Sequence, residues 1–512
     1  MTALANPETA ASLRAGNFVS SWPRVLRLLV LTVLFSAAAV YEAGNLKSLT
    51  TPEVWVHIRS GTWIWQNHAV PRTGLFSQYP SLAWNDSTWA FDALLGAAYR
   101  LLGLAAIPVV FMAMKAALAG LMFFLARALR ARFWAAVFLS AVAQYVIWSL
   151  QPLPYVCSIF FLTIEIELLM SSRRTGSPRR LFWLPLIFAV WANFHVQFLL
   201  GLVLLGLFLI SLCAESWLRG MGVSWLSSRI GPIPLIPASA AVALSTLATL
   251  ATPYTFRLLP QAFHALYSDV AFEHFTELGS MSFRRPQEFA LMLLLMMAFL
   301  ALGRLRALEL FELLMLSAGT AIAFRIQRDS WMVVLPAVAV LASGFLSRPN
   351  DDDSDRASAF KWGGAYVAGI TVLVLVIAAL RLPSRDVLMG RVNQNFPVKA
   401  CDAIVANKLP APLFNAYSWG SFVTWYLPQY PVIVDSRTEM YGDDNLAKYF
   451  DVVGGKGRLE DAPMVATAGT LLLERNSAIA KALTNLPRLR SQYRLVYSDE
   501  IASVFIPEKQ KQ

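Results

Sequence analysis

Charged residues are scarce in this sequence. Asp, Glu, Lys and Arg together make up 15% of the 512 residues, whereas about a quarter is usual in a soluble domain. This shortage excludes an ordinary soluble protein. The hydrophobic share of 57% and the mean hydropathy of +0.52 indicate lipid as the main solvent. Many Leu-, Ala- and Val-rich stretches reach the ~20 residues needed to cross ~30 Å of hydrocarbon.

Cysteine is also rare, and no internal repeat or low-complexity segment stands out. Cys157, Cys213 and Cys401 are scattered along the chain. Their spacing excludes a disulfide framework and a cysteine-based zinc site. The net charge of +11 does not indicate nucleic acid as a partner, because Lys and Arg cluster in short loops between apolar segments, as membrane topology requires.

Apolar segments predict a polytopic α-helical membrane protein with about eleven spans between residues 24 and 382. The first span, about 24–44, follows a tail at 1–23. Ser36-Ala37-Ala38-Ala39 offers the small residues of a signal-peptide cleavage site, but the apolar run is long for a signal peptide, so we favour an uncleaved span. The other spans are expected near 105–126, 133–150, 154–171, 181–196, 198–215, 233–252, 288–303, 309–324, 330–347 and 362–382.

Basic residues in alternate loops predict the orientation of the chain. They are Arg127, Arg130 and Arg132, then Arg173, Arg174, Arg179 and Arg180, then Arg219 and Arg229, then Arg304 and Arg306, and finally Arg348, Arg356 and Lys361. The short loops at 151–153 and 194–197 contain no Lys or Arg. The positive-inside rule then places the N-terminus in the cytoplasm and the loops 45–104 and 253–287 outside. Everything after residue 383 is also expected outside.

The tail, 383–512, has the composition of a small α/β domain. Strand-like runs occur at Pro412–Asn415, Val432–Asp435, Thr470–Glu474, Tyr493–Tyr497 and Ala502–Ile506. Helical patterns such as Val398–Asn407 lie between them. At the end of the second run, Asp435 is placed either to pair with Arg437 or to cap the next element, which favours a structural role for both residues.

Polar residues gather on the predicted outer side, where functional groups of a membrane protein reach a water-filled cavity. They are Glu53, His57, Arg59, Asp86 and Asp92 in the first loop, then Asn193, His195 and Gln197 at a tight turn, then Glu273, His274, Glu277, Arg284 and Arg285, and lastly Arg325, Arg328 and Asp329 at another turn. The predicted cytoplasmic loops contain mainly Arg and small polar residues. Any chemistry therefore belongs outside.

The first outer loop is the most informative segment. Glu53, His57 and Gly61 recur every four residues, so a helix places them on one face. Trp55, Trp63 and Trp65 lie beside them, which predicts an amphipathic helix in the membrane interface. Two interpretations stay open: an aromatic belt with a few solvated charges, or a carboxylate and an imidazole held above a groove between spans.

Ionisable residues also occur within the predicted spans. Lys115 lies in one span, and Glu165 and Glu167 lie in another. Pairing between the lysine and a glutamate reduces the cost of burying both charges. We prefer such a structural pair to a proton or ion path, because no chain of acids links the two faces.

A set of motifs in order resembles the bacterial members of the GT-C glycosyltransferase superfamily. The motifs are Thr51-Pro52-Glu53-Val54-Trp55-Val56-His57-Ile58-Arg59-Ser60-Gly61, then Val70-Pro71-Arg72-Thr73-Gly74-Leu75-Phe76-Ser77, then Trp84, Trp89, Asn193-Phe194-His195, Thr252-Pro253-Tyr254, Glu277, and Arg325 or Arg328, and in the tail Asn415-Ala416-Tyr417-Ser418-Trp419-Gly420-Ser421, Val434-Asp435-Ser436-Arg437 and Tyr441-Gly442. The resemblance covers most of the chain.

This resemblance implies a GT-C-like protein of the bacterial inner membrane with a C-terminal extracytoplasmic domain. Its activity is expected to be an inverting transfer of sugar from a polyprenyl-phosphate donor to an extracytoplasmic glycan, lipid or protein. Glu53 is the first choice for the base that accepts the proton of the acceptor hydroxyl, and Asp86 the second. His57, Arg59, Asn193, His195 and Glu277 are expected to bind substrate, and Arg325 or Arg328 the leaving phosphate.

Several acids of the family pattern are missing. The family's first Asp corresponds to Thr51, its second to Glu53, and the Asp before Phe-Ser to Gly74, whereas Asp92 keeps the acid that follows Trp89. No cofactor is fixed and a divalent metal is left open. The missing acids support an alternative, a non-catalytic scaffold for envelope polysaccharide synthesis. A secondary transporter is the third possibility, but related halves with polar midplane residues are not evident.

Overall fold

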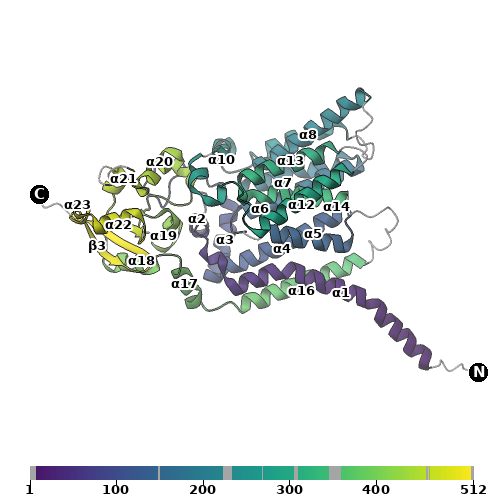
Figure 1. Cartoon of the computed structure of the whole chain (residues 1–512), viewed down its shortest axis with the longest axis horizontal. Coiled ribbons are helices and arrows are strands. Elements are labelled where there is room, and N and C mark those ends of the chain that lie inside the picture. Colours follow the sequence, from purple (N-terminus) through teal and green to yellow (C-terminus); the bar gives the residue numbers. More distant parts are fainter. Residues whose placement is uncertain are drawn as a thin grey trace, which may run out of the picture.

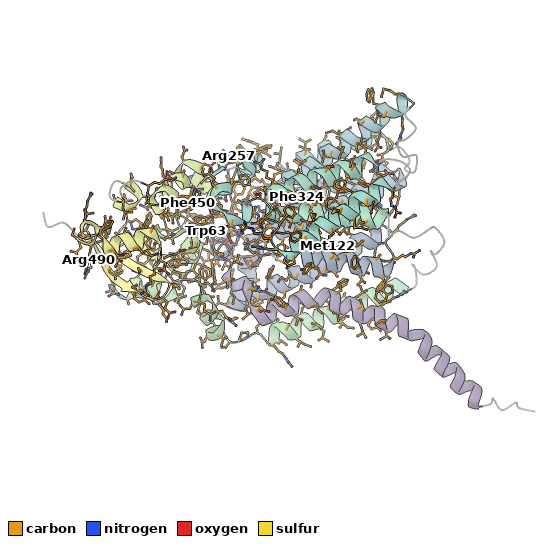
Figure 2. The ribbon with its side chains drawn as sticks, in the orientation of Figure 1. Trp63, Met122, Arg257, Phe324, Phe450 and Arg490 are labelled. Atoms are coloured by element: carbon orange, nitrogen blue, oxygen red, sulfur yellow. The ribbon has the colours of Figure 1, made fainter. Side chains whose placement is uncertain are left out.

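The computed structural model describes residues 7–147, 150–222, 233–267, 269–304, 309–344, 359–456, 459 and 462–508. Arg229, Arg306, Arg348 and Arg356, which contributed to the predicted orientation, lie outside this described part. The described chain is mostly helical, with a helix bundle at one end and a small C-terminal domain containing a β-sheet at the other (Figure 1). In Figure 2, Met122 lies within the bundle, Arg490 lies far out on the C-terminal domain, and Trp63 lies between the two parts.

Each of the eleven predicted spans contains a helix. These are α1 (Pro7–Asn45), α4 (Ala106–Ala128), α5 (Phe133–Val146), α6 (Tyr155–Thr175), α7 (Leu184–Phe194), α8 (Phe198–Gly220), α9 (Leu235–Ala248), α12 (Pro286–Gly303), α13 (Leu310–Arg325), α14 (Trp331–Ser343) and α16 (Ala359–Leu380). The start of α12 carries a recognisable helix signal. In α12, proline occupies the first position and the Glu288 carboxylate accepts hydrogen bonds from the backbone N–H groups of Arg284 and Arg285, as in a capping box.

Fewer helices than eleven meet the length and composition of a complete span. Within the described residues, five helices do so, or six if α16 and the following helix α17 (Arg385–Asn393), which are bent by 79° at their junction, count as one span. Several of the others are short: α7 has 11 residues, which at 1.5 Å per residue is about half of the hydrocarbon thickness. The count of eleven therefore stays a prediction.

The first loop folds into two helices, α2 (Val54–Asn67) and α3 (Trp89–Leu102), that cross at close range. A Cβ atom added to Gly61 would lie 1.8 Å from the backbone oxygen of Asp92, and one added to Gly96 would lie 2.5 Å from the carbonyl carbon of Gly61. Only glycine permits this approach. Because α3 continues into α4 as one apolar stretch, Trp89–Ala128, α3 fixes α2 to the end of the bundle.

The first turns of α2 pack against protein, whereas Trp65 near its end is exposed, and the position of α2 in the membrane interface stays a prediction. Trp55 is fully buried. Its ring packs against Phe396, Phe422 and Trp425, with centroid distances of 5.6, 5.4 and 4.6 Å. The last two belong to α19 (Tyr417–Tyr426) of the C-terminal domain. Packing of aromatic rings is a strong apolar contact, so this cluster joins the domain to the bundle.

The C-terminal domain contains a four-stranded mixed sheet in the order β1-β2-β4-β3. Its strands are β1 (Leu413–Asn415), β2 (Thr470–Glu474), β3 (Tyr493–Ser498) and β4 (Ala502–Pro507), and its helices after α17 are α18 (Val398–Ala406), α19, α20 (Thr438–Val453), α21 (Pro463–Ala466), α22 (Ala478–Asn485) and α23 (Pro487–Arg490). β1 is parallel to β2, and the other neighbours are antiparallel. Four of the five predicted strands are confirmed.

The fifth predicted strand, Val432–Asp435, is wrong. Val432 forms only isolated bridges, to Leu413 and to Ser77 of the first loop. The Ile433 N–H is shared between the Leu413 oxygen of β1, at 3.1 Å, and Asn415 Oδ1, at 3.0 Å, and Asn415 Nδ2 donates to the Val434 oxygen at 2.9 Å. The amide side chain thus satisfies backbone groups where the ladder with β1 does not continue.

The predicted pairing of Lys115 with a glutamate of α6 is also wrong. Lys115 Nζ lies 3.2 Å from Glu42 Oε2 on α1, because α4 packs directly on α1. Glu167 pairs with Arg180 at 3.1 Å, and the Glu165 carboxylate has no hydrogen-bond partner within the described part of the chain. The structural role expected for Lys115 is retained, with a different acid.

Candidate functional site

A cavity of about 240 Å³ lies where the end of the bundle meets the C-terminal domain. Its lining comes from the first loop, the α7–α8 turn, the segment between α9 and α12, the α13–α14 turn and the start of α20. Glu53, His57, Asp86, Asp92, His195, Gln197, Glu277, Arg328, Asp329, Tyr417, Arg437 and Glu439 are among the lining residues. Segments far apart in the sequence therefore form one polar site.

Six of the nine predicted site residues line this cavity. They are Glu53, Asp86, His57, His195, Glu277 and Arg328. The structure brings these side chains together, whereas their roles stay predictions.

The other three predicted residues lie outside the cavity and have contacts of their own. Arg59 stacks its guanidinium on Phe76 at 4.6 Å. Asn193 accepts a hydrogen bond from Trp89 Nε1 at 2.9 Å and donates to the Ala251 oxygen at 2.8 Å. Arg325 is exposed and lies over the Phe272 ring at 5.5 Å.

Glu53 stands at the N-terminus of α2 with an unsatisfied carboxylate. Its Oε2 atom is buried and has no hydrogen-bond partner among the described residues. Burial and the negative charge of Glu277 raise its pKa to about 7, against the smaller opposing effects of its backbone and of His57 and Arg328. Near neutral pH this carboxyl group is therefore present in both its protonated and its charged form.

Asp86 is the second carboxyl group with a free oxygen. Its Oδ1 accepts from the backbone N–H of Thr88 at 3.1 Å and from the Thr88 hydroxyl at 3.0 Å, while the buried Oδ2 has no partner among the described residues. Burial and the nearby Asp92 raise the pKa of Asp86 well above its ordinary value. Thr88 also donates to Asp92 Oδ1 at 3.2 Å, so one hydroxyl connects two acids.

Three histidines line the cavity, and two of them, His57 and His195, are held in place by hydrogen bonds. His57 Nδ1 lies 2.8 Å from Asp92 Oδ1, and burial lowers the pKa of His57. His195 Nδ1 lies 2.9 Å from the Ser158 hydroxyl. Burial, together with the positive charge of Arg328, lowers the pKa of His195 to about 3. His195 is therefore a neutral group at physiological pH.

Arg328 is the cationic side chain that the bundle contributes to the cavity. It lies in the 3-10 turn Gln327–Ser330 between α13 and α14. It forms ion pairs with Glu277 at 3.6 Å and with Asp329 at 3.7 Å. Asp329 is in turn held by Gln197 Nε2 at 2.9 Å, so the arginine has a fixed partner on its far side.

Arg328, Glu277 and Tyr155 also line a second cavity of about 260 Å³, together with Arg285 and apolar residues such as Met281. Arg328 therefore stands at the boundary between two neighbouring cavities.

The C-terminal domain supplies a second arginine, Arg437, and this one is buried. Arg437 forms a two-point ion pair with Asp435, with distances of 2.9 Å (Nε–Oδ1) and 2.6 Å (Nη2–Oδ2). Its remaining nitrogen, Nη1, donates to the Leu75 oxygen at 2.7 Å, and the guanidinium lies over Trp84 at 4.5 Å. The pairing with Asp435 that the sequence suggested is therefore present, and it also fixes the first loop.

Glu439 and Tyr417 are cavity residues that sequence reasoning missed. Both are partly buried, and the loss of water around Glu439 raises the pKa of its carboxyl group. Glu439 follows the Asp-x-Arg motif by two residues, so its proximity to that motif was the available signal.

The lining also allows a test for a divalent metal. Among the described residues, no group of three or more His, Cys, Asp or Glu side chains is arranged to hold a metal ion. Metal sites of this kind need such a converging ligand set. The described part of the lining therefore does not present a ligand set that fits a resident metal.

Comparison with known proteins shows the fold. No protein-family model matches the chain, and no curated protein matches it. Among solved structures, the chain is similar to the oligosaccharyltransferase of Archaeoglobus fulgidus in its apo form, with a TM-score of 0.52 and 10% identity over 96% of this chain and 76% of that one.

The same archaeal enzyme, AglB, is also similar in two further structures. One is tethered to an acceptor peptide and the other is in complex with an inhibitory peptide and a dolichol-phosphate. Both have a TM-score of 0.52 and 12% identity, covering 96% of this chain and 75% of the other. At this identity the likeness concerns architecture alone. The chain therefore shares the overall fold of this archaeal enzyme, with apolar helices and a C-terminal domain that contains a sheet.

Proposed function

We propose that this chain is a membrane glycosyltransferase that moves a sugar from a polyprenyl-phosphate donor to an extracytoplasmic acceptor. The observation that carries the proposal is the cavity at the junction of bundle and C-terminal domain. There, two buried carboxyl groups with free oxygens, on Glu53 and Asp86, line the same space as Arg328. The GT-C-like fold and the dolichol-phosphate bound to the archaeal neighbour support a lipid-phosphate donor.

Arg328 is the proposed site for the donor phosphate. As the bond between the anomeric carbon and the phosphate oxygen breaks, its electron pair passes to that oxygen and negative charge grows there. A guanidinium in a buried site stabilises such charge strongly. The neighbouring cavity with Arg285 and Met281 offers space on the other side of Arg328 for the rest of the lipid head.

Glu53 and Asp86 are the proposed groups that bind the acceptor hydroxyl. The acceptor oxygen forms the new bond to the anomeric carbon and loses its proton in the process, so a group that accepts a hydrogen bond from it lowers the barrier. Glu53 remains our first choice and Asp86 our second. His57, His195 and Glu277 line the same cavity and are proposed to contact substrate.

The membrane arrangement is part of the proposal. We infer eleven spans in the bacterial inner membrane, with the N-terminus in the cytoplasm and residues 383–512 outside. The alternation of basic loops supports this orientation. It places the cavity on the outer side, where a lipid-linked sugar and an envelope glycan, lipid or protein meet.

Transfer by the purified full-length chain tests the proposal. The chain in lipid nanodiscs is incubated with a panel of polyprenyl-phosphate hexoses carrying a radiolabelled sugar and with envelope extract as acceptor. The wild-type chain is expected to transfer label. The double variant Glu53→Gln, Asp86→Asn is expected to lose at least about 100-fold in rate. Full activity of this double variant would sink the assignment of the acceptor site.

Arg328 and Arg325 provide a matched pair of variants. The two arginines are three residues apart, Arg325 at the end of α13 and Arg328 in the 3-10 turn that follows, but only Arg328 lines the cavity. Arg328→Ala is expected to reduce the rate about 100- to 1,000-fold, and Arg325→Ala far less. Equal losses would contradict the placement of the phosphate. If the wild-type chain transfers no donor and instead copurifies with a fixed set of envelope proteins, the non-catalytic scaffold becomes the better account.

A further inference from the structure

A histidine–aspartate pair in the cavity supports a role for His57 beyond the substrate contact proposed above. His57 and Asp92 both line the cavity. Nδ1 of the imidazole lies 2.8 Å from Asp92 Oδ1, and the aspartate side chain is 2% exposed. The imidazole ring also rests edge-on against Phe91, with a centroid distance of 5.6 Å. The ring is therefore fixed in orientation by a carboxyl group and by packing.

The backbone is built to allow this contact. His57 lies on α2 and Asp92 on α3, one helical turn before Gly61 and Gly96 respectively. The absence of side chains at these two glycines lets the helices approach until a Cβ on Gly61 would overlap the backbone oxygen of Asp92, at 1.8 Å. Overlap of this kind forces the backbones apart. Glycine at the crossing is therefore what brings the carboxylate within hydrogen-bond distance of the imidazole.

The second nitrogen of the imidazole remains open to the cavity. In the tautomer that carries its hydrogen on Nδ1, next to Asp92, the neutral ring keeps its lone pair on Nε2. No described residue forms a hydrogen bond with Nε2, and the side chain is 14% exposed. A neutral imidazole with one nitrogen anchored on a carboxylate and the other open to a cavity has the geometry of a general base.

We propose that His57 accepts the proton of the acceptor hydroxyl at Nε2, and that Asp92 is the positioning residue that holds the ring and stabilises its charged form. This inference rests on the proposed glycosyl transfer and moves the proton acceptor from the carboxyl groups to the imidazole. Glu53 and Asp86 then hold the acceptor by hydrogen bonds.

The step balances in atoms and charge. The acceptor oxygen forms its bond to the anomeric carbon, the bond from that carbon to the phosphate oxygen breaks towards phosphate, and the acceptor proton goes to Nε2. The imidazolium beside Asp92 later releases this proton to water. Burial favours this division of labour, because it lowers the pKa of His57 and raises the pKa of the neighbouring acids Glu53, Asp86 and Asp92. The lowered pKa of His57 favours the unprotonated imidazole at neutral pH.

Other titratable groups face the imidazole and influence its pKa. They are Glu53 at the start of α2, Asp86 in the first loop, Asp92 on α3, His195 at the α7–α8 turn and Glu439 on α20. The experiment therefore varies Asp92 alone and follows each histidine separately.

Carbethoxylation of histidine tests the pairing without requiring activity. The full-length chain in nanodiscs is treated with diethyl pyrocarbonate between pH 4.5 and 8, and peptide mass spectrometry follows each site. The reagent attacks the unprotonated nitrogen. In wild type, His57 is expected to react, and in Asp92→Asn its midpoint is expected to fall by about one pH unit, because a neighbouring negative charge is lost. The exposed His68 serves as an internal reference.

A second His–Asp pair provides the matched control. His264 lies 3.6 Å from Asp443, so Asp443→Asn is expected to leave the His57 midpoint in place. Unchanged labelling of His68 and His264 in Asp92→Asn shows that this variant is folded, and Asp92→Ala serves as a second variant if it is not. An unreactive His57 in wild type, or a midpoint that Asp92→Asn does not move, overturns the pairing.

Transfer kinetics test the role in the reaction. Asp92→Asn and His57→Gln are each expected to lower kcat about 100-fold with little change in KM for the donor, and the double variant is expected to be no worse than His57→Gln alone. The acidic limb of the wild-type pH–rate profile is expected below pH 6.5 and should shift with Asp92→Asn. A limb near pH 7 that disappears in Glu53→Gln assigns the proton to Glu53 and overturns this inference alone. Absence of transfer by wild type overturns it together with the proposed function.

Discussion

Replacement of Gly61 by alanine is the sharpest test of how the first loop builds the site. The added Cβ would lie 1.8 Å from the Asp92 oxygen and 2.6 Å from its carbonyl carbon, whereas ordinary contacts begin at 3.4 Å. Both atoms are backbone, so no side-chain rotation relieves the overlap. Helices α2 and α3 have to separate by about 1.6 Å. A movement of that size breaks the 2.8 Å contact between His57 and Asp92.

The expected change in the free energy of unfolding of Gly61→Ala is the sum of opposing effects. Alanine in place of a helical glycine stabilises a helix by about 1 kcal/mol, whereas overpacking of this kind costs about 1–3 kcal/mol or somewhat more. Loss of the hydrogen bond adds about 1 kcal/mol. We therefore expect Gly61→Ala to lower the free energy of unfolding by about 2 kcal/mol and to shift the carbethoxylation midpoint of His57.

Gly206→Ala on α8 is the control, because nothing lies within 4 Å of its added Cβ and only the gain in helix propensity remains. Thermal unfolding of the two variants in the same nanodiscs, followed by size-exclusion chromatography, measures the difference. Gly61→Ala should lower Tm and Gly206→Ala should raise it slightly. A Gly61→Ala chain as stable as Gly206→Ala, with unchanged His57 labelling, would refute the close crossing.

Three other predictions concern charges in the structure. Arg437→Ala leaves a buried acid without its partner and removes the bond to Leu75, so we expect a loss of about 3–5 kcal/mol, seen as a lower Tm and faster proteolysis of the C-terminal domain. Glu42→Gln is expected to destabilise the chain because it leaves Lys115 unpaired, and Lys115→Met in the same chain should restore part of the loss, which a double-mutant cycle measures. Glu53 has a folded-state pKa of about 7, above its ordinary 4.5. Its contribution to the free energy of unfolding is therefore full below pH 4.5 and is lost as pH rises to 7. We expect Tm to fall less between pH 5 and 8 in Glu53→Gln than in wild type.

Apolar composition and short β-rich runs in the sequence predicted most of the helices and strands. The helices of the bundle follow from apolar composition, and β2 (Thr470–Glu474) was predicted with its observed bounds, because a short β-rich run between turn residues has few alternatives. The prediction of a strand at Val432–Asp435 is wrong for a reason that hydrophobic periodicity does not reveal. The Asn415 amide binds the backbone of this segment, and such long-range side-chain contacts leave no periodic signal.

Pairings between distant elements were beyond sequence reasoning. Lys115 was matched with acids of α6, but the pair depends on which helix packs against α4, and the answer is Glu42 on α1. The choice between Arg325 and Arg328 was open for a similar reason. Arg325 ends α13, and its side chain is exposed. Arg328 lies three residues later in the 3-10 turn, which contains the non-helical Asp329, and it lines the cavity.

The C-terminal domain is a wall of the proposed site rather than an appendage to the bundle. Arg437 binds the Leu75 oxygen at 2.7 Å, Val432 pairs with Ser77, and Glu439 closes the cavity beside Asp86. These contacts keep water from acids whose pKa burial raises. If the domain moved away, water would return and these carboxyl groups would ionise near their ordinary pKa. The electrostatics of the cavity, and with them the proposed proton transfer to an imidazole, therefore depend on a domain that begins more than 300 residues after Glu53.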